Sequence, residues 1–111
     1  MNTSYFAKYK GDKGVSIAII TPRWASKHRR YPPLMPTREL VNAYKKGLIT
    51  PQEYETQYMA ILTERGITPR QVLADLGDDA VLLCYEKKGL FCHRHIVAKW
   101  LRKDGIMGTE L

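Results

Sequence analysis

The feature that most constrains the fold is an unbroken apolar run, Ala80–Tyr85, that is followed by Glu86. Runs of this kind are typical of strands buried on both faces, and such strands occur mainly in parallel sheets that are covered on both sides. A second run, Val15–Ile20, stops at Thr21-Pro22, because proline cannot donate to a strand ladder. The two runs therefore predict an α/β fold with a central, mainly parallel sheet.

Start and stop signals between and after these runs predict four helices. The first three begin at a threonine that can cap the first turn and end at a glycine, over residues 37–47, 50–66 and 68–77. A fourth helix is predicted over residues 92–103, where the apolar residues recur at helical spacing. Helices of this number can cover the predicted sheet.

The remaining predictions complete a small single-domain sandwich over residues 1–111. Residues 4–9 are rich in β-formers and predict a first strand, and Ile106-Met107 predicts a short closing strand. A chain of 111 residues forms one domain that can bury a modest core without metal or disulfide staples. We therefore expect a sheet that is flanked by about four helices.

The net charge of +7 is concentrated in the first third of the chain. Residues 1–36 carry seven Lys or Arg residues and one acid, and within them residues 22–36 form a basic, proline-punctuated loop. A localised basic face is typical of proteins that bind nucleic acid or a phosphorylated small molecule. The alternative is a charged surface that only keeps the protein soluble.

The basic loop also contains aromatic residues, which favours one form of the nucleic-acid hypothesis. Stacking side chains beside phosphate contacts are typical of proteins that bind single strands. The residues that would make this contact are Trp24, Lys27, Arg29, Arg30 and Tyr31. No helix-turn-helix or ribonucleoprotein motif accompanies them.

The chain has no apolar stretch near the roughly 20 residues that a membrane-spanning helix needs. We therefore expect a cytoplasmic protein without a membrane partner. Cys84 and Cys92 lie eight positions apart and could form one disulfide. In a reducing cytoplasm free thiols or metal ligands are the expected state.

The fourth predicted helix, residues 92–103, differs from the others because no Ser, Thr, Asp or Asn precedes it. Its first N–H groups need partners, which Cys92, Glu86 or a bound anion could supply. Arg94 lies in the first turn, where its guanidinium could grip a phosphate or carboxylate. This pattern predicts an anion site at the start of the helix.

Candidate reacting groups gather in the same window. Cys92 is a candidate nucleophile or redox thiol, Glu86 a candidate general acid or base, and Cys84 and His93 are candidate reacting or orienting groups. Helical spacing predicts that Cys92 and His93 point inward and that His95 faces solvent. The alternative is that these cysteines are small buried hydrophobes and that His93 is a hydrogen-bonded core residue.

Zinc is a weaker hypothesis for the same cluster. Cys84, Cys92 and one of His93 or His95 could supply three ligands, with His28 as a fourth. The spacing does not match a standard zinc motif, and adjacent residues rarely both coordinate one ion. No cofactor is therefore predicted.

The segments Leu82–Glu86 and Phe91–His95 resemble the signature of the family named DUF488, in which a Leu-Leu-Cys-x-Glu strand end precedes a helix that opens with Cys-His-Arg. The resemblance extends over about Val15–Leu101 and implies an α/β fold and an intracellular bacterial or phage protein. Family members often carry Asp-x-Arg after the early strand, and the corresponding arginine here is Arg23 in Thr21-Pro22-Arg23. The resemblance implies no particular activity.

Together these patterns favour binding of a phosphate-bearing small ligand, such as a nucleotide or nucleoside derivative, with or without catalysis. Arg94, Arg23 and His95 are the predicted anion contacts. Nucleic-acid binding through the basic loop is the second hypothesis. A phage or host module that binds another protein through the same loop is the third.

Overall fold

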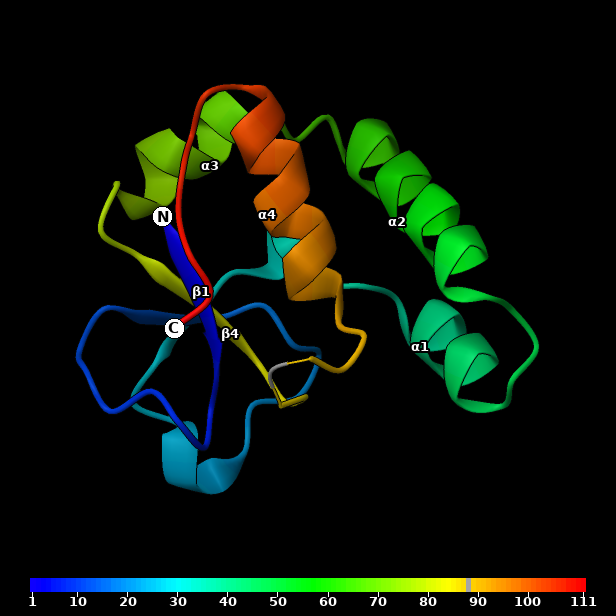
Figure 1. Ribbon diagram of the computed structural model, residues 1–111, viewed down its shortest axis with the longest axis horizontal. Helices are drawn as coiled ribbons and strands as arrows, with labels where there is room; N and C mark the ends of the chain where they lie inside the picture. Colours follow the sequence, from blue (N-terminus) through cyan, green and yellow to red (C-terminus); the bar gives the residue numbers. More distant parts are fainter. Residues whose placement is uncertain (88) are drawn as a thin grey trace.

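The structure is a computed structural model that describes residues 1–87 and 89–111. Its sheet has the strand order β1-β4-β2-β3, and every neighbouring pair is parallel. The strands are β1 (Asn2–Tyr5), β2 (Gly14–Ser16), β3 (Arg29–Arg30) and β4 (Val81–Cys84). The helices are α1 (Arg38–Lys45), α2 (Pro51–Arg65), α3 (Pro69–Leu76) and α4 (His93–Lys103) (Figure 1). The predicted small α/β domain with a parallel sheet and four helices is confirmed.

The helices begin where the sequence predicts them to begin. The side chains of Thr37, Thr50 and Thr68 each accept a hydrogen bond from a backbone N–H in the following turn. At Thr50 the side chain of Glu53 also accepts a bond from the Thr50 backbone N–H, which completes a capping box. The residue before α4 is Cys92, and it makes no side-chain capping bond. Among the described residues no helix is long and apolar enough to cross a membrane.

The strand predicted over residues 15–20 is shorter in the structure, because its later residues leave the sheet. The amide of Ile17 still donates to the carbonyl of Leu83, at 3.0 Å. The carbonyl of Ile17 is instead bound by the imidazole of His93, at 2.7 Å, so a side chain from α4 takes the place of a neighbouring strand. This hydrogen bond joins the end of β2 directly to the start of α4.

The two terminal strands differ from prediction. The first covers Asn2–Tyr5 and not residues 4–9, because the amides of Lys8 and Tyr9 fold back onto the carbonyl of Tyr5 in a turn. The closing strand does not form at Ile106-Met107. The chain pairs with β1 further on, where the amide of Thr3 donates to Thr109 and the amide of Leu111 donates to Thr3. The C-terminal segment thus lies against the outer edge of β1 (Figure 1).

The core consists of two apolar clusters in the described chain. In the larger cluster Val15 and Leu82 of the sheet, together with Ile17 just after β2, share a core with residues of all four α-helices. Its helical members are Leu40, Tyr54, Tyr58, Leu62, Val72, Ile96, Val97 and Leu101. In the smaller cluster Val81 and Leu83 meet residues of the turn after β1 and of the loop after β2, chiefly Phe6 and Ala25. The sheet is therefore covered by helices on one face and largely by loops on the other.

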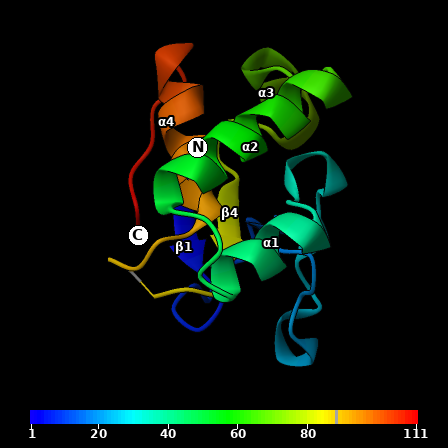
Figure 2. The ribbon, with the colours of Figure 1, turned by 90° about the vertical axis from the view of Figure 1, so that its right-hand side faces the viewer.

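The spatial order of the helices places the start of α4 at the centre of the molecule. α4 packs against β1 and β4, α2 packs against α4, and α1 packs against α2 (Figures 1 and 2). The loop of residues 22–36 contains two short 3-10 helices, Arg23–Ala25 and Pro32–Leu34, with β3 between them. The hydroxyl of Tyr58 on α2 donates to the carbonyl of Leu34, which fixes the end of this loop to the helical layer.

Candidate functional site

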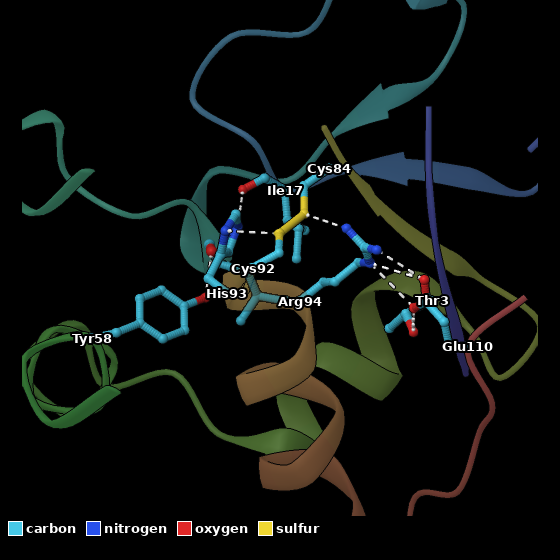
Figure 3. Close-up of a disulfide and its surroundings, with 9 residues drawn as sticks. Thr3, Ile17, Tyr58, Cys84, Cys92, His93, Arg94 and Glu110 are labelled. Carbon is cyan, nitrogen blue, oxygen red and sulfur yellow. Dashed lines mark hydrogen bonds and ion pairs between the residues drawn. A yellow bond between two sulfur atoms is a disulfide. The ribbon is translucent and has the colours of Figure 1, made fainter. Parts of the chain in front are cut away.

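The structure joins Cys84 and Cys92 in a disulfide, with their Cα atoms 7.5 Å apart. Cys84 is the last residue of β4 and Cys92 precedes the first residue of α4, so the bond links the strand end to the helix start (Figure 3). Both residues are buried. The expectation of free thiols is therefore wrong for this structure, because the short connection between β4 and α4 returns the second sulfur to the first.

His93 lies beside the disulfide in a defined orientation. Its Nε2 is 2.7 Å from the carbonyl oxygen of Ile17, which can only accept, so Nε2 carries the proton. The unprotonated Nδ1 then faces the sulfur of Cys92 at 3.8 Å (Figure 3). Burial lowers the pKa of His93 to about 4, although the bond to Ile17 acts in the opposite direction. The inward orientation predicted for Cys92 and His93 is confirmed, and the imidazole is neutral near pH 7.

Arg94 is fully buried on the other side of the disulfide. Its Nη1 donates to the sulfur of Cys84 at 3.2 Å. Its Nη2 donates to Oε2 of Glu110 at 2.9 Å, and its Nε donates to Oε1 of the same carboxylate at 3.1 Å. The ring of Tyr5 lies 5.8 Å from the guanidinium carbon. Each nitrogen of this buried guanidinium therefore donates to a group of the same chain.

The position of Glu110 corrects the expectation that Arg94 is open to an external anion. The predicted fork-like grip on a carboxylate does form, but the carboxylate comes from the C-terminal segment (Figure 3). The hydroxyl of Thr3 donates to the same carboxylate. Burial acts to raise the pKa of Glu110, and the hydrogen bonds from Arg94 and Thr3 outweigh that effect and lower it. Sequence reasoning missed Glu110, since nothing in its neighbourhood marks it as a partner of residue 94.

A cavity of about 730 Å³ opens beside the disulfide. Cys84, Cys92 and His93 lie on its inner side, next to the half-buried Glu86. Arg38 and Lys45, which are the first and last residues of α1, contribute positive charge to its lining. The structure thus brings four of the predicted reacting groups to one concave surface.

Three aromatic residues form one wall of this cavity. The ring centroid of Phe91 lies 4.7 Å from that of Tyr44 and 5.1 Å from that of Tyr54. All three rings line the cavity. The three rings come from α1, α2 and the segment before α4, so the wall forms only when these elements pack together.

The other predicted anion contacts lie elsewhere. Arg23 is exposed in the loop after β2 and lies outside the cavity. His95 is half-buried, whereas the sequence predicts that it faces solvent. It lines a second, smaller hollow beside Lys99, Arg102 and Glu110. Burial lowers the pKa of His95, and the charge of Arg94 lowers it further. Neither residue joins the disulfide and His93 at the cavity.

The residues proposed for nucleic-acid binding divide into two groups. Trp24 is 64% exposed and Lys27 is also exposed, so both are open to a partner. Tyr31 is buried, and its hydroxyl donates to the carboxylate of Asp75, so its expected stacking role is wrong for this structure. The exposed side chains of Arg29 and Arg30 donate to the carbonyls of Asp75 and Ile19 and help to hold the loop in place.

The zinc hypothesis has a partial geometric basis. The sulfurs of Cys84 and Cys92 and a ring nitrogen of His93 all lie within 4.8 Å of one another. Zinc binds cysteine as thiolate, and sulfurs joined in a disulfide are not thiolates. The described residues therefore fit a zinc ion only after the disulfide is reduced.

The fold and the site define a class of small parallel α/β proteins in which a Cys-x-Glu strand end meets a Cys-His-Arg helix start beside a cavity. The family model described as "DUF488-N3a: Active DUF488-N3 subclade" matches residues 7–105. The chain belongs to the DUF488 family, as the signature at residues 82–95 predicts. Neither the comparison with curated proteins nor that with solved structures found a match.

Proposed function

We propose that the protein binds a phosphate-bearing small ligand, such as a nucleotide or nucleoside derivative, in the 730 Å³ cavity at the start of α4. The observation that carries this proposal is the composition of the cavity. An aromatic wall, two cations and a cluster of reacting groups share one concave surface of the size that small-molecule sites usually have. We expect the protein to act in the cytoplasm.

The chemistry of the lining supports this proposal, because different residues suit different parts of such a ligand. The rings of Tyr44, Tyr54 and Phe91 offer apolar faces to a planar base. The phosphate is expected at Arg38 and Lys45, which replace the buried Arg94 in this role. A further attraction comes from the start of α4, because the positive end of a helix favours negative charge.

A chemical role at this site would fall to the groups on its inner side. Glu86 is half-buried and lines the cavity, where it is the candidate general acid or base. His93 is neutral and presents Nδ1 toward Cys92. The description of the matched family as an active subclade favours catalysis over simple storage of the ligand.

Isothermal titration calorimetry with a series of nucleosides and their mono- and diphosphates tests the proposal. Arg38→Ala and Lys45→Ala should each weaken phosphate binding about tenfold and leave the weaker binding of the unphosphorylated nucleoside unchanged. Lys46→Ala is the matched control, because Lys46 is an exposed neighbour of Lys45 that does not line the cavity. Equal effects of all three substitutions, or no heat with any of these ligands at millimolar concentration, would contradict the proposal.

A second candidate function is binding of single-stranded nucleic acid, which one specific observation favours. Trp24 and Tyr85 are both exposed and both contact Phe6 edge-on, with ring centroids 6.5 and 5.2 Å apart. Lys10 lies 6.0 Å from the Trp24 ring. Exposed rings beside cations are the elements that single-strand binding uses.

Fluorescence titration with an oligonucleotide distinguishes this second function from the first. Binding should quench Trp24, fall steeply between low and physiological salt, and be lost in Trp24→Ala. Trp100→Phe is the control, since Trp100 is a half-buried part of the core. An affinity that does not change with salt would exclude phosphate contacts as its source.

A further inference from the structure

We propose that the Cys84–Cys92 disulfide is a thiol–disulfide exchange centre whose substrate is a small thiol that enters through the 730 Å³ cavity. The proposal concerns electron transfer at sulfur and does not depend on the binding of a phosphorylated ligand. It rests on the groups that surround the two sulfurs, which differ from each other. A disulfide that only stabilises the fold does not need a different polar partner at each sulfur.

Arg94 identifies the sulfur that leaves. Its Nη1 donates to Cys84 at 3.2 Å, so a charged donor already points at the atom that would carry negative charge after the S–S bond breaks (Figure 3). A neighbouring guanidinium favours the thiolate over the thiol, and a sulfur with a stabilised thiolate leaves faster. Cys84 is therefore the leaving group, and Cys92 is the sulfur that is attacked.

His93 is the partner of the other sulfur, that of Cys92. The carbonyl of Ile17 holds the proton on Nε2, and this leaves the lone pair of Nδ1 directed at Cys92, 3.8 Å away. After reduction this nitrogen can accept a hydrogen bond from the Cys92 thiol. Each sulfur thus has a partner that suits one half of the reaction.

The cavity gives a small thiol access to the bond. Cys84 and Cys92 are almost completely buried, yet both line the cavity, beside Arg38 and Lys45. The two cations suit a thiol that carries carboxylates, such as glutathione. A cytoplasmic location, which we expect for this protein, is also one in which disulfides are usually transient and catalytic or redox-sensing.

The reaction follows from this assignment and uses two molecules of the small thiol. The thiolate of the first attacks the sulfur of Cys92, the S–S bond breaks, and Cys84 takes the electron pair and remains as a thiolate beside Arg94. The thiolate of the second attacks the sulfur of the first in the mixed disulfide, and Cys92 leaves and takes a proton from water in the cavity. The small thiol is oxidised to its disulfide, and the protein is reduced to one thiol and one thiolate.

The full oxidised chain, treated with reduced glutathione and quenched with acid at intervals, tests the proposal directly. The rate of disulfide loss should rise in proportion to glutathione concentration while circular dichroism shows that the protein stays folded. Mass spectrometry of the quenched intermediate should place glutathione on Cys92. A rate that levels off at the unfolding rate measured in urea, or an adduct on Cys84, would overturn the proposal.

Two substitutions in one ion pair separate an electrostatic role of Arg94 from a structural one. Arg94→Gln removes the donor to Cys84 and should slow reduction at least about tenfold. Glu110→Gln removes the carboxylate that shares the guanidinium, so reduction should be as fast as in the wild type or faster. A structural role predicts that both substitutions loosen the site and change the rate in the same direction, and that result would contradict the proposal.

The state of the thiols after reduction provides an independent check. If Arg94→Gln does not fold, the proposal is still tested by the reduction rates of the wild type and Glu110→Gln and by the cysteine that carries the glutathione adduct. The reduced chain should close again in oxidised glutathione. Two thiols that fail to close, or that retain a stoichiometric zinc ion with His93 after dialysis, would overturn the proposal in favour of a metal site.

Discussion

The guanidinium of Arg94 and the carboxylate of Glu110 form a largely buried ion pair in which Nη2 lies 2.9 Å from Oε2. Arg94 is in the first turn of α4, and Glu110 lies in the segment that pairs with β1 after the helix has ended. The pair therefore holds the C-terminal segment against the start of α4. It also places a negative group where the sequence predicts an external anion, so the residue that most resembles an anion receptor is already occupied.

Glu110→Gln should destabilise the protein, because it leaves the fully buried Arg94 without a charged partner. Glutamine keeps one acceptor oxygen, so we expect a loss of about 2 kcal/mol near pH 7 in urea-unfolding experiments. Glu55→Gln is the comparison, because Glu55 forms an exposed ion pair with Lys99 at 2.6 Å. That substitution should cost less than about 0.5 kcal/mol.

The effect of Glu110→Gln on the free energy of unfolding should also depend on pH. The folded-state pKa of Glu110 lies below its unfolded value, so its contribution is complete above the unfolded pKa and is lost as pH falls through the folded one. The difference in unfolding free energy between wild type and Glu110→Gln should therefore shrink as the solution is acidified below about pH 4.5. A difference that stays constant down to pH 2 would show that the carboxylate is not ionised in the folded protein.

His93 should make the protein acid-sensitive over a different interval. Its folded-state pKa is about 4, against 6.5 for an ordinary histidine, so between these values the unfolded chain binds a proton that the folded chain does not. Stability is then complete above pH 6.5 and falls toward pH 4, by up to about 1.4 kcal/mol per pH unit. His93→Gln should remove this part of the slope in denaturation curves. Nitrogen chemical shifts that show a proton on Nδ1 at pH 7 would contradict the assigned tautomer.

Local signals made most of the fold predictable from the sequence. α2 begins after Thr50 and ends at Gly66 as expected, because a capping threonine and a left-handed glycine each act on the adjacent turn of the helix. The apolar run at 80–85 correctly predicts a buried strand, because its length is typical of a strand and too short for a helix. The end of β2 was not predictable, since it depends on His93, which is 76 residues away in the sequence.

The candidate site could be predicted in its members but not in its connections. Cys84, Cys92 and His93 meet as expected, because a short loop must return the chain from β4 to α4. The partner of Arg94 could not be predicted, since the pairing depends on how residues 108–111 dock beside β1. The disulfide likewise depends on the distance between two sulfurs, which sequence spacing does not determine.

Tyr58→Phe should be destabilising although it removes a single oxygen. The hydroxyl of Tyr58 donates to the carbonyl of Leu34 at 2.5 Å in a fully buried setting, and phenylalanine leaves that carbonyl without its donor. We expect a loss of about 1–2 kcal/mol by thermal or urea unfolding. Tyr54→Phe is the matched control one turn earlier on α2, because the ring of Tyr54 is also buried but lines the cavity. Its loss should be below about 0.5 kcal/mol, and equal losses would show that the Leu34 bond is not the cause.

Gly108→Ala should lift the C-terminal segment from β1. A Cβ atom at residue 108 would overlap the backbone oxygen of Met1, and backbone cannot move aside as a flexible side chain can. The bonds between Thr3 and both Thr109 and Leu111 lie in the same docked segment and should weaken with it. Hydrogen exchange at the amides of Thr3 and Leu111 should therefore accelerate at least about tenfold.

Gly105→Ala is the control for this last substitution. Residue 105 has a φ of 80° and open space around its Cα, so alanine there costs about 1 kcal/mol of backbone strain without a clash. It should lower overall stability slightly and leave the local exchange of Thr3 and Leu111 close to that of the wild type. If Gly108→Ala also loses the Arg94–Glu110 pair, its stability should no longer respond to Glu110→Gln, because the carboxylate has already left the guanidinium. Additive losses in the double variant would instead mean that Glu110 stays on Arg94 while the rest of the segment moves.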